Sequence, residues 1–342
     1  MATVPTYKLF CIGNPLLDIQ VRGGEALLEK YGLKANDAVL AEERHMPMHV
    51  RPSAHSYDEL VQNYPVTYVA GGGSQNAARA AAYVLLPDSV VYVGCVGDDE
   101  FADRLRAANK REGLHDRYLV KTGERTGACA VILTGYHRSL VPTLRAAEKF
   151  EKSHLSSPEV APLVDAAGYI YVDGYFLTHG TESVFALNLA APFIAQSFIA
   201  QLQSVLPYCD IIIGNETEAE AYASATGLPE PKNLVLTARA IALLPKANPK
   251  QPRIVVITRG PEPTVLVSSV DSNNVKVYKV TPIPDSLIVD TNGDGDAFAG
   301  GFLSALIAGK NLDECVEVGH KMGAMCVQMV GPQFKWPKVQ IL

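Results

Sequence analysis

The sequence predicts an α/β fold with a large, mainly parallel central sheet and a small β-sheet lid. Short β-rich apolar runs alternate with helical patterns along most of the chain, which is typical of strands joined by crossover helices. Two stretches, residues 17–70 and 126–144, break this rhythm with alternating strand-like pieces. We therefore expect residues 1–16, 71–125 and 145–342 to form a large domain and the two other stretches to form the lid.

The individual elements follow from local hydrophobic patterns. Strands are expected at residues 7–12, 90–96, 128–134, 169–177, 184–189, 211–214 and 254–258, and helices at residues 75–86 and 100–113. Only the six residues Thr178 to Ser183 separate the fourth and fifth of these strands, whereas a parallel crossover needs about a dozen. Either these two strands are not parallel neighbours, or a helix is absent from the given sequence.

Composition excludes several classes of protein. With 342 residues, of which 48% are hydrophobic, the chain can bury a large core. The net charge of −6 offers no basic field for nucleic acid, and no apolar run approaches the roughly 20 residues of a membrane span. The start of the chain lacks a signal-peptide pattern, so a cytoplasmic location is expected, and nuclear entry is also compatible. Six scattered cysteines without CxxC spacing favour buried thiols over zinc.

A glycine-rich segment, Asp290-Thr-Asn-Gly-Asp-Gly-Asp296, precedes an apolar run that reads as a buried helix. Small residues let backbone N–H groups point at a ligand, and a helix N-terminus adds partial positive charge, so a phosphate is the natural guest. An aspartate in that field is a candidate base. The alternative is a tight turn with an Asp N-cap that opens a core helix.

Two further segments offer binding groups. Ala70-Gly-Gly-Gly-Ser-Gln-Asn76 opens an alanine-rich helix, either to let a substrate approach the backbone or simply to pack closely. After the first strand, Asn14 and Asp18 provide an amide and a carboxylate that could hold vicinal hydroxyls. Neither GxxxxGK[ST] nor a strand-to-helix GxGxxG occurs, so the common NTPase and dinucleotide-binding folds lose support.

Together these segments resemble the ribokinase-like (PfkB) family of carbohydrate and nucleoside kinases over nearly the whole chain. Residues 290–296 look like the DTxGAGD signature, residues 71–76 like the amino-terminal GG signature, residues 94–101 match GxxGxDxF and residues 215–218 match NxxE. Four ordered motifs are a specific combination. The branch that acts on adenosine is indicated by Asn14–Ile19, Arg138–Leu140, Tyr175–Thr178, Asn188–Pro192 and Gly319–His320.

This resemblance implies a three-layer α/β/α nucleotide-binding and catalytic domain with a β-sheet lid. The implied activity is ATP-dependent phosphorylation of the adenosine 5′-hydroxyl with Mg²⁺, giving AMP and ADP in purine salvage, by a monomer whose partner is a small-molecule substrate. Asp296 would be the catalytic base. The backbone N–H groups of Asn292, Gly293, Asp294 and Gly295 would form the anion hole for the transferred phosphoryl group.

The same resemblance assigns the substrate side. Asp18 would bind the 2′- and 3′-hydroxyls, with help from Gly72, Gly73 and Asn76, while Asn14 supports the pocket. Leu40 and Phe176 are candidates for the adenine slot, with ordinary core packing as the alternative. Arg138 would meet the phosphates when the lid closes, or else be a surface arginine.

On the donor side, Asn215 and Glu218 would organise Mg²⁺, in the case of Glu218 through water. The alternative is a solvated Asn and Glu at a helix start. Thr258, Gly260 and His320 would contact the nucleotide, although His320 could equally be a structural histidine.

One departure from the family pattern bears on activity. Asp294 stands where the signature has alanine, in the middle of the expected anion hole. At about 4 Å and an effective dielectric constant near 20, repulsion between two such charges is about 4 kcal/mol before screening. If the side chain points inward, the protein could be a nucleoside-binding protein with little turnover; if outward or toward Mg²⁺, the cost is small. Another nucleoside or a sugar is the alternative acceptor.

Overall fold

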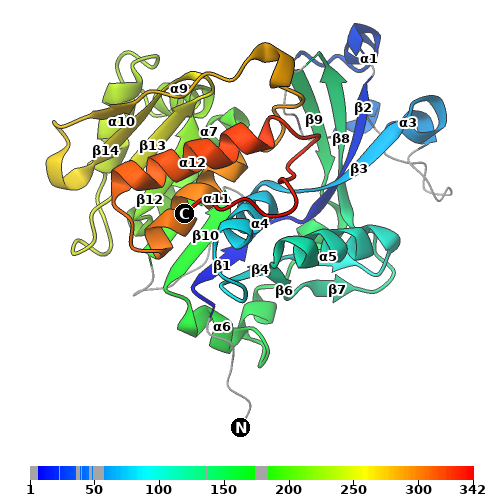
Figure 1. Cartoon of the computed structure of the whole chain (residues 1–342), viewed down its shortest axis with the longest axis horizontal. Helices are drawn as coiled ribbons and strands as arrows, with labels where there is room; N and C mark the ends of the chain where they lie inside the picture. Colours follow the sequence, from blue (N-terminus) through cyan, green and yellow to red (C-terminus); the bar gives the residue numbers. More distant parts are fainter. Residues whose placement is uncertain are drawn as a thin grey trace.

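A mainly parallel sheet forms the centre of the larger part of the protein (Figure 1). The computed structural model describes residues 7–342 apart from 23, 36–38, 40, 46–47, 49–57, 136 and 174–183. Within these residues the sheet contains β1 Leu9–Ile12, β4 Val90–Val93, β6 His115–Asp116, β10 Tyr169–Asp173, β11 Val184–Asn188, β12 Ile211–Asn215, β13 Ile254–Arg259, β14 Glu262–Ser268 and β15 Lys276–Tyr278. Their order is β15-β14-β13-β12-β11-β10-β1-β4-β6, and only the pairs β13–β14 and β14–β15 are antiparallel.

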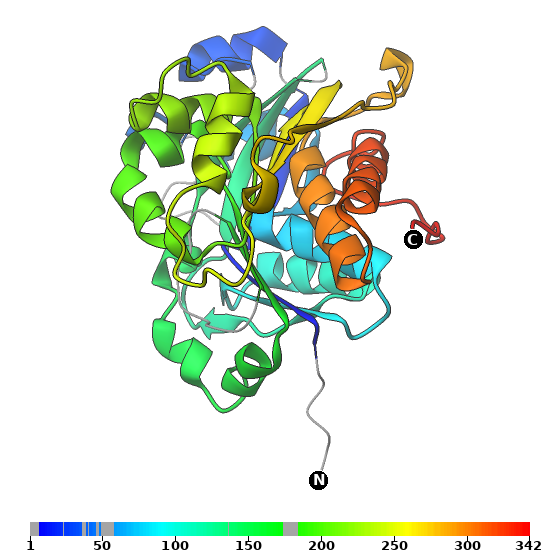
Figure 2. The ribbon, with the colours of Figure 1, turned by 90° about the vertical axis from the view of Figure 1, so that its left-hand side faces the viewer.

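Helices cover both faces of this sheet (Figure 2). One face carries α6 Ala161–Ala166, α7 Pro192–Ser197, α8 Ile199–Val205, α9 Glu216–Ala225 and α10 Leu234–Ala242. The other carries α4 Gly73–Val84, α5 Glu100–Glu112, α11 Asp294–Ile307 and α12 Leu312–Cys326. In β1, Phe10 and Ile12 enter the first core while Leu9 and Cys11 enter the second, because successive strand residues face opposite sides. The expected three-layer α/β/α architecture is confirmed.

A second, smaller sheet lies beside the first. It consists of β3 Val66–Gly71, β2 Leu16–Arg22, β8 Gly127–Thr134 and β9 His137–Thr143, in the order β3-β2-β8-β9. Two short helices flank it, α1 Gly24–Tyr31 and α3 Asp58–Asn63 (Figure 1). Leu27 of α1 and Leu60 of α3 join Ile132 in its hydrophobic core. The expected small sheet is therefore present, while the division of the chain into two domains stays a prediction.

Two sequence expectations need correction. The single strand expected at residues 90–96 is divided at Gly94 into β4 and β5 Cys95–Gly97, which pairs with β7 Leu119–Lys121. A Cβ at Gly94 would lie 2.7 Å from the Gly13 carbonyl oxygen, so the chain can bend here only without a side chain. Strands β10 and β11 are parallel neighbours, so the first explanation of their short connection is wrong. Their connection lies outside the described residues.

Other expectations agree with the structure. The helices expected at residues 75–86 and 100–113 correspond to α4 and α5. All six cysteines are buried with free thiols. Among the helices of the described part, none combines the length and apolar character that crossing a membrane requires.

Gly300 allows α4 and α11 to pack unusually closely, so Gly300→Ala should destabilise the protein. The added Cβ would lie 2.5 Å from Ala80 Cβ and 2.9 Å from the Ala81 backbone nitrogen. We expect the free energy of unfolding to fall by about 1–3 kcal/mol in a denaturant titration, as overpacking does. Gly168→Ala is the control, because its nearest neighbour would be 3.9 Å away. Equal stability of the two variants would contradict the close packing.

Candidate active site

The glycine turn that opens α4 lies directly against the predicted substrate-binding residues. A Cβ at Gly71 would overlap the Asp18 carboxylate, and one at Gly72 would overlap the Asn14 carbonyl oxygen. Gly72 also has a φ of 89°, which disfavours any side chain. Because these glycines have no side chains, their backbone can lie directly against Asp18 and Asn14. This close approach brings the β1–β2 turn and strand β2 to the start of α4.

The same turn reaches the predicted catalytic base. A Cβ at Gly73 would lie 3.3 Å from Asp296 Oδ1. Asn76, one turn further along α4, donates its amide Nδ2 to Asp296 Oδ2 at 3.1 Å. The buried Arg79 in turn donates to Asn76 Oδ1 at 3.0 Å and also to the carbonyl oxygens of Ala70 and Pro332. Arg79 thus holds the amide in the orientation that presents its N–H to the carboxylate.

Asp296 has the protonation behaviour of a base that works near neutral pH. Burial raises the pKa of its carboxyl to about 7, and the neighbouring carboxylates Asp173 and Asp294 add to the rise. Asn76 and Arg138 act in the opposite direction, because they stabilise the ionised form. A carboxyl with this pKa is mostly ionised at physiological pH, and the ionised form can accept a proton.

Asp173 is a site residue that the sequence analysis missed. It ends β10, is 4% exposed, and accepts the Ser74 N–H at Oδ2 over 3.2 Å. A Cβ at Gly73 would lie 3.7 Å from this carboxylate, which places Asp173 next to Asp296. The available signal was a carboxylate at the carboxyl end of a parallel strand, where ligands bind in α/β sheets.

Asp290 organises the loop before α11 and was likewise not among the predicted site residues. It is completely buried, and its Oδ1 accepts the Asn292 N–H at 2.8 Å. Its Oδ2 accepts the Gly331 N–H at 2.7 Å and the Gln20 amide at 3.3 Å. One carboxylate therefore fixes the loop to strand β2 and to the C-terminal segment.

The helix α11 begins without a capping side chain. Its N-cap is Gly293, with φ 78°, whereas Asn side chains cap α9 and α12. The N–H groups of residues 292–295 are predicted to face a ligand, and in this structure two of them have acceptors within the protein. The Asn292 N–H is bonded to Asp290, because that carboxylate closes the turn, and the Gly295 N–H donates to Asp294 Oδ1 at 2.8 Å.

Two side chains of the smaller sheet contact this loop. Asn292 donates its amide to Asp18 Oδ2 at 2.8 Å, and Arg138 of β9 donates to Thr291 Oγ1 at 3.4 Å. Burial raises the pKa of Asp18 to about 7, while the Asn292 hydrogen bond lowers it. Arg138 lowers the pKa of Asp18, Asp294 and Asp296, so its charge acts on the whole group of carboxylates.

The predicted donor-side residues meet at the ends of two neighbouring strands. Asn215 ends β12 directly opposite Thr258 of β13. Asn215 also caps α9, and Glu218 accepts its N–H at 2.9 Å and its side-chain amide at 2.8 Å. Burial raises the pKa of Glu218 to about 7. The Asn–Glu pair is therefore a mutual cap rather than the solvated pair considered as an alternative.

This arrangement limits how the pair could hold magnesium. Two of the lone-pair positions of Glu218 are used by Asn215, and a carboxylate has about four. Within the part of the chain that the structure describes, three or more His, Cys, Asp or Glu side chains nowhere gather as metal ligands. The pair therefore fits contact with the water shell of a magnesium ion, which keeps several of its waters. That role stays a prediction.

The remaining predicted residues have different outcomes. Gly260 lies in the exposed turn between β13 and β14, with φ 53°. His320 Nε2 is hydrogen-bonded to Thr264 Oγ1 at 2.8 Å, and burial lowers the pKa of His320. The structural role is thus present, while a nucleotide contact stays a prediction. Leu40 and Phe176 lie outside the described residues.

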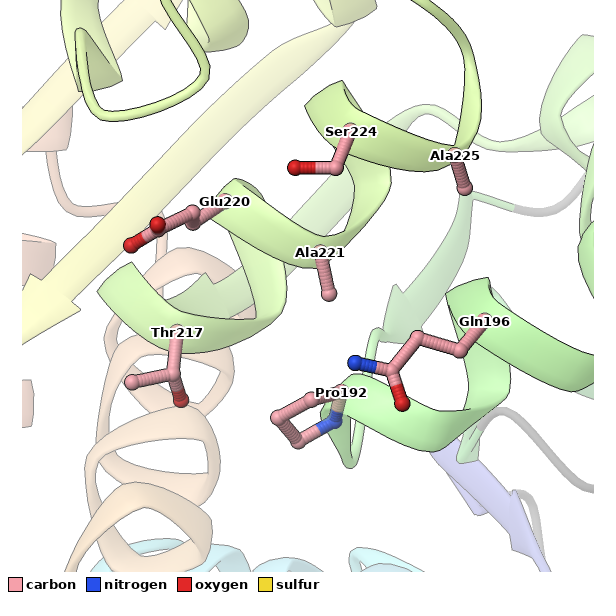
Figure 3. A pocket seen from close by; sticks show the side chains of 7 residues that line it. All are labelled: Pro192, Gln196, Thr217, Glu220, Ala221, Ser224 and Ala225. Carbon is pink, nitrogen blue, oxygen red and sulfur yellow. The ribbon is translucent and has the colours of Figure 1, made fainter.

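A pocket between α7 and α9 adjoins the donor-side pair without including any of the predicted site residues. Pro192 and Gln196 line it from α7, and Thr217, Glu220 and Ser224 line it from α9 (Figure 3). None of these side chains is itself a predicted site residue, and Glu220 and Ser224 lie along α9 away from its capped start. Thr217, however, lies between Asn215 and Glu218 and donates its hydroxyl to Asn215 Oδ1 at 2.7 Å.

The raised pKa of Asp296 predicts a pH-dependent gain in stability from Asp296→Asn. Because the folded-state pKa of about 7 exceeds the ordinary value of about 4, the folded state binds more protons between these pH values. Stability from this group is therefore present below pH about 4 and lost as the pH rises through 7. The variant should melt at a higher temperature than the parent at pH 8, and the difference should shrink toward pH 4.5. Asp103→Asn, in the exposed first turn of α5, is the control; a pH-independent difference would refute the assignment.

Comparison with known proteins agrees with this geometry. Residues 25–339 match the model of the "pfkB family carbohydrate kinase". An "Adenosine kinase" of Schizophyllum commune is 59% identical, over 98% of this chain and 99% of that protein. The structure of Anopheles gambiae adenosine kinase with P1,P4-di(adenosine-5) tetraphosphate has a TM-score of 0.88 and 38% identity, over 95% of this chain and 96% of that one. That of Schistosoma mansoni adenosine kinase with adenosine and AMP has a TM-score of 0.87 and 32% identity, over 96% and 97%. The chain belongs to the pfkB family of carbohydrate kinases.

Proposed function

We propose that this protein transfers the γ-phosphoryl group of ATP to the 5′-hydroxyl of adenosine, giving AMP and ADP, as in purine salvage. The observation that carries the proposal is the meeting of Asp18 and Asp296 at one glycine turn, with the start of α11 beside them. The relatives named adenosine kinase support it, as do the neighbours that hold adenosine with AMP or two adenosines joined by four phosphates.

Asp18 would bind the ribose of the acceptor. Its Oδ2 is held by the Asn292 amide, and its Oδ1 lies against the backbone of Gly71. An ionised carboxylate accepts hydrogen bonds only, so it suits the 2′- and 3′-hydroxyls, and Asn14 at the adjacent turn would support the same pocket. A deoxyribose would leave one lone pair of this buried carboxylate without a donor, which penalises the wrong substrate.

Asp296 would remove the proton of the 5′-hydroxyl as the new oxygen–phosphorus bond forms. Geometry is the main requirement for this step, and the Asn76 amide fixes the carboxylate that performs it. The start of α11 and the positive charge of Arg138 would stabilise charge on the transferred group. Magnesium, when bound, neutralises charge on the donor phosphates, and Glu218 with Asn215 would orient its water shell.

The described part of the site draws all its residues from one chain, so we propose that a monomer is sufficient. Contacts between the loop before α11 and two strands of the smaller sheet would exclude water during transfer. Exclusion of water matters because water is a competing acceptor.

Purified protein with adenosine and MgATP should form AMP and ADP in equal amounts. Asp296→Asn should lower kcat by about 10²- to 10⁴-fold, the usual contribution of a general base, while the Kd for adenosine changes little. Product chromatography and calorimetry measure the two quantities, with Asp103→Asn as the control. The proposal fails if adenosine binds and no AMP appears, or if inosine or ribose is the preferred acceptor.

Asp18→Ala should remove the preference for ribosides. We expect the ratio of kcat/KM for adenosine to that for 2′-deoxyadenosine to fall by about 10- to 100-fold, the size of a lost hydrogen bond to a charged group. Arg22→Ala, at the exposed end of the same strand, should leave the ratio unchanged. An unchanged ratio in Asp18→Ala would place the ribose elsewhere.

A further inference from the structure

The carboxylate of Asp294 folds back onto the start of its own helix. Its Oδ1 accepts the Gly295 N–H at 2.8 Å. The preceding residue, Gly293, offers no capping side chain, in contrast to the Asn or Asp caps of α5, α9 and α12. Asp294 thus supplies, from inside the helix, the acceptor oxygen that an N-cap side chain supplies in these other helices.

The groups around Asp294 act on the charge of its carboxyl in both directions, and their net effect is a raised pKa. Burial raises the pKa of its carboxyl, while Arg138 and the backbone N–H groups of Gly295 and Asp294 lower it. Asp290 opposes them as a like charge. The side chain nevertheless remains partly exposed, so it can rotate away from the helix without displacing the core.

We propose that, in the ligand-free protein, the Asp294 carboxylate occupies the Gly295 N–H, a hydrogen-bond donor that the γ-phosphoryl group of ATP needs. The carboxylate must rotate away before ATP takes its reactive position. A single N–H cannot donate at full strength to two anions, and two anions beside one N–H repel each other. Asp294 therefore sets the affinity for the terminal phosphate of the donor.

This inference rests on the proposed function. It predicts different effects on ATP and ADP, whereas a general charge effect would act on both nucleotides. ADP carries no γ-phosphoryl group, so it does not compete with the carboxylate at this place. Removing the carboxylate should favour the triphosphate selectively. The protein would then hold ATP more tightly relative to its product.

The test compares two nucleotides on three variants. The Kd values of the magnesium complexes of β,γ-imido-ATP and of ADP are measured by calorimetry for the parent, Asp294→Ala and Asp294→Asn, without adenosine. For Asp294→Ala we expect about 10-fold tighter binding of the ATP analogue, or about 1.4 kcal/mol, and less than about 2-fold change for ADP. Asp294→Asn should lie between, because it keeps the shape and loses the charge. KM for ATP should fall in Asp294→Ala while KM for adenosine is unchanged.

Asp103→Ala, which removes a first-turn carboxylate from α5, is the matched control and should bind both nucleotides as the parent does. Equal gains for both nucleotides, no gain, or weaker binding of the ATP analogue would each overturn the proposal. If Asp294→Ala does not fold, Asp294→Asn alone decides. Because nucleotide binding is measured without adenosine, absence of AMP formation in every variant would contradict the proposed function and leave this result standing.

Discussion

The site depends on how closely the backbone of residues 71–73 approaches its neighbours. Any side chain at Gly71 or Gly72 would overlap Asp18 or the backbone of Asn14, and Gly73 lies beside Asp296. Three segments far apart in sequence meet at this turn because nothing projects from it. Helices α4 and α11 lie side by side on one face of the central sheet, and Gly300 lets them pack at short range.

At this turn and at the start of α9 the protein buries carboxylates that would be more stable in water. Burial raises the pKa of Asp18, Asp296 and Glu218 to about 7 in each case. Amide donors compensate part of this cost, since Asn292 binds Asp18, Asn76 binds Asp296 and Asn215 binds Glu218. Neutral amides orient a carboxylate without neutralising it, so the group remains a base. Such local instability is the usual condition of a site that must change its protonation state.

The loop before α11 and the first turn of α11 are stabilised by different groups. Asp290 closes the loop with both oxygens and attaches it to Gln20 and Gly331. The helix that follows has no N-cap side chain, which leaves its first turn dependent on whatever anion is present. In most helices a cap settles this requirement permanently. Here the Asp294 carboxylate accepts the Gly295 N–H, and we propose that a substrate phosphate replaces it.

The sequence by itself determined the α/β class, the helices α4 and α5, most strands, and the four family motifs, because these depend on local periodicity and on residues close together in the chain. The sequence also pointed to Asp18, Asn76, Asp296 and Asn215. In the structure Asn76 is hydrogen-bonded to Asp296, Asp18 to Asn292 and Asn215 to Glu218.

Only the tertiary structure decided which donors each carboxylate uses. The roles of Asp173, Asp290 and Arg79 and the parallel pairing of β10 with β11 arise from contacts between distant segments or from burial. Long-range contacts and burial are not encoded in a local sequence pattern. The same Asp can cap a helix, close a loop or receive a proton, according to what packs around it.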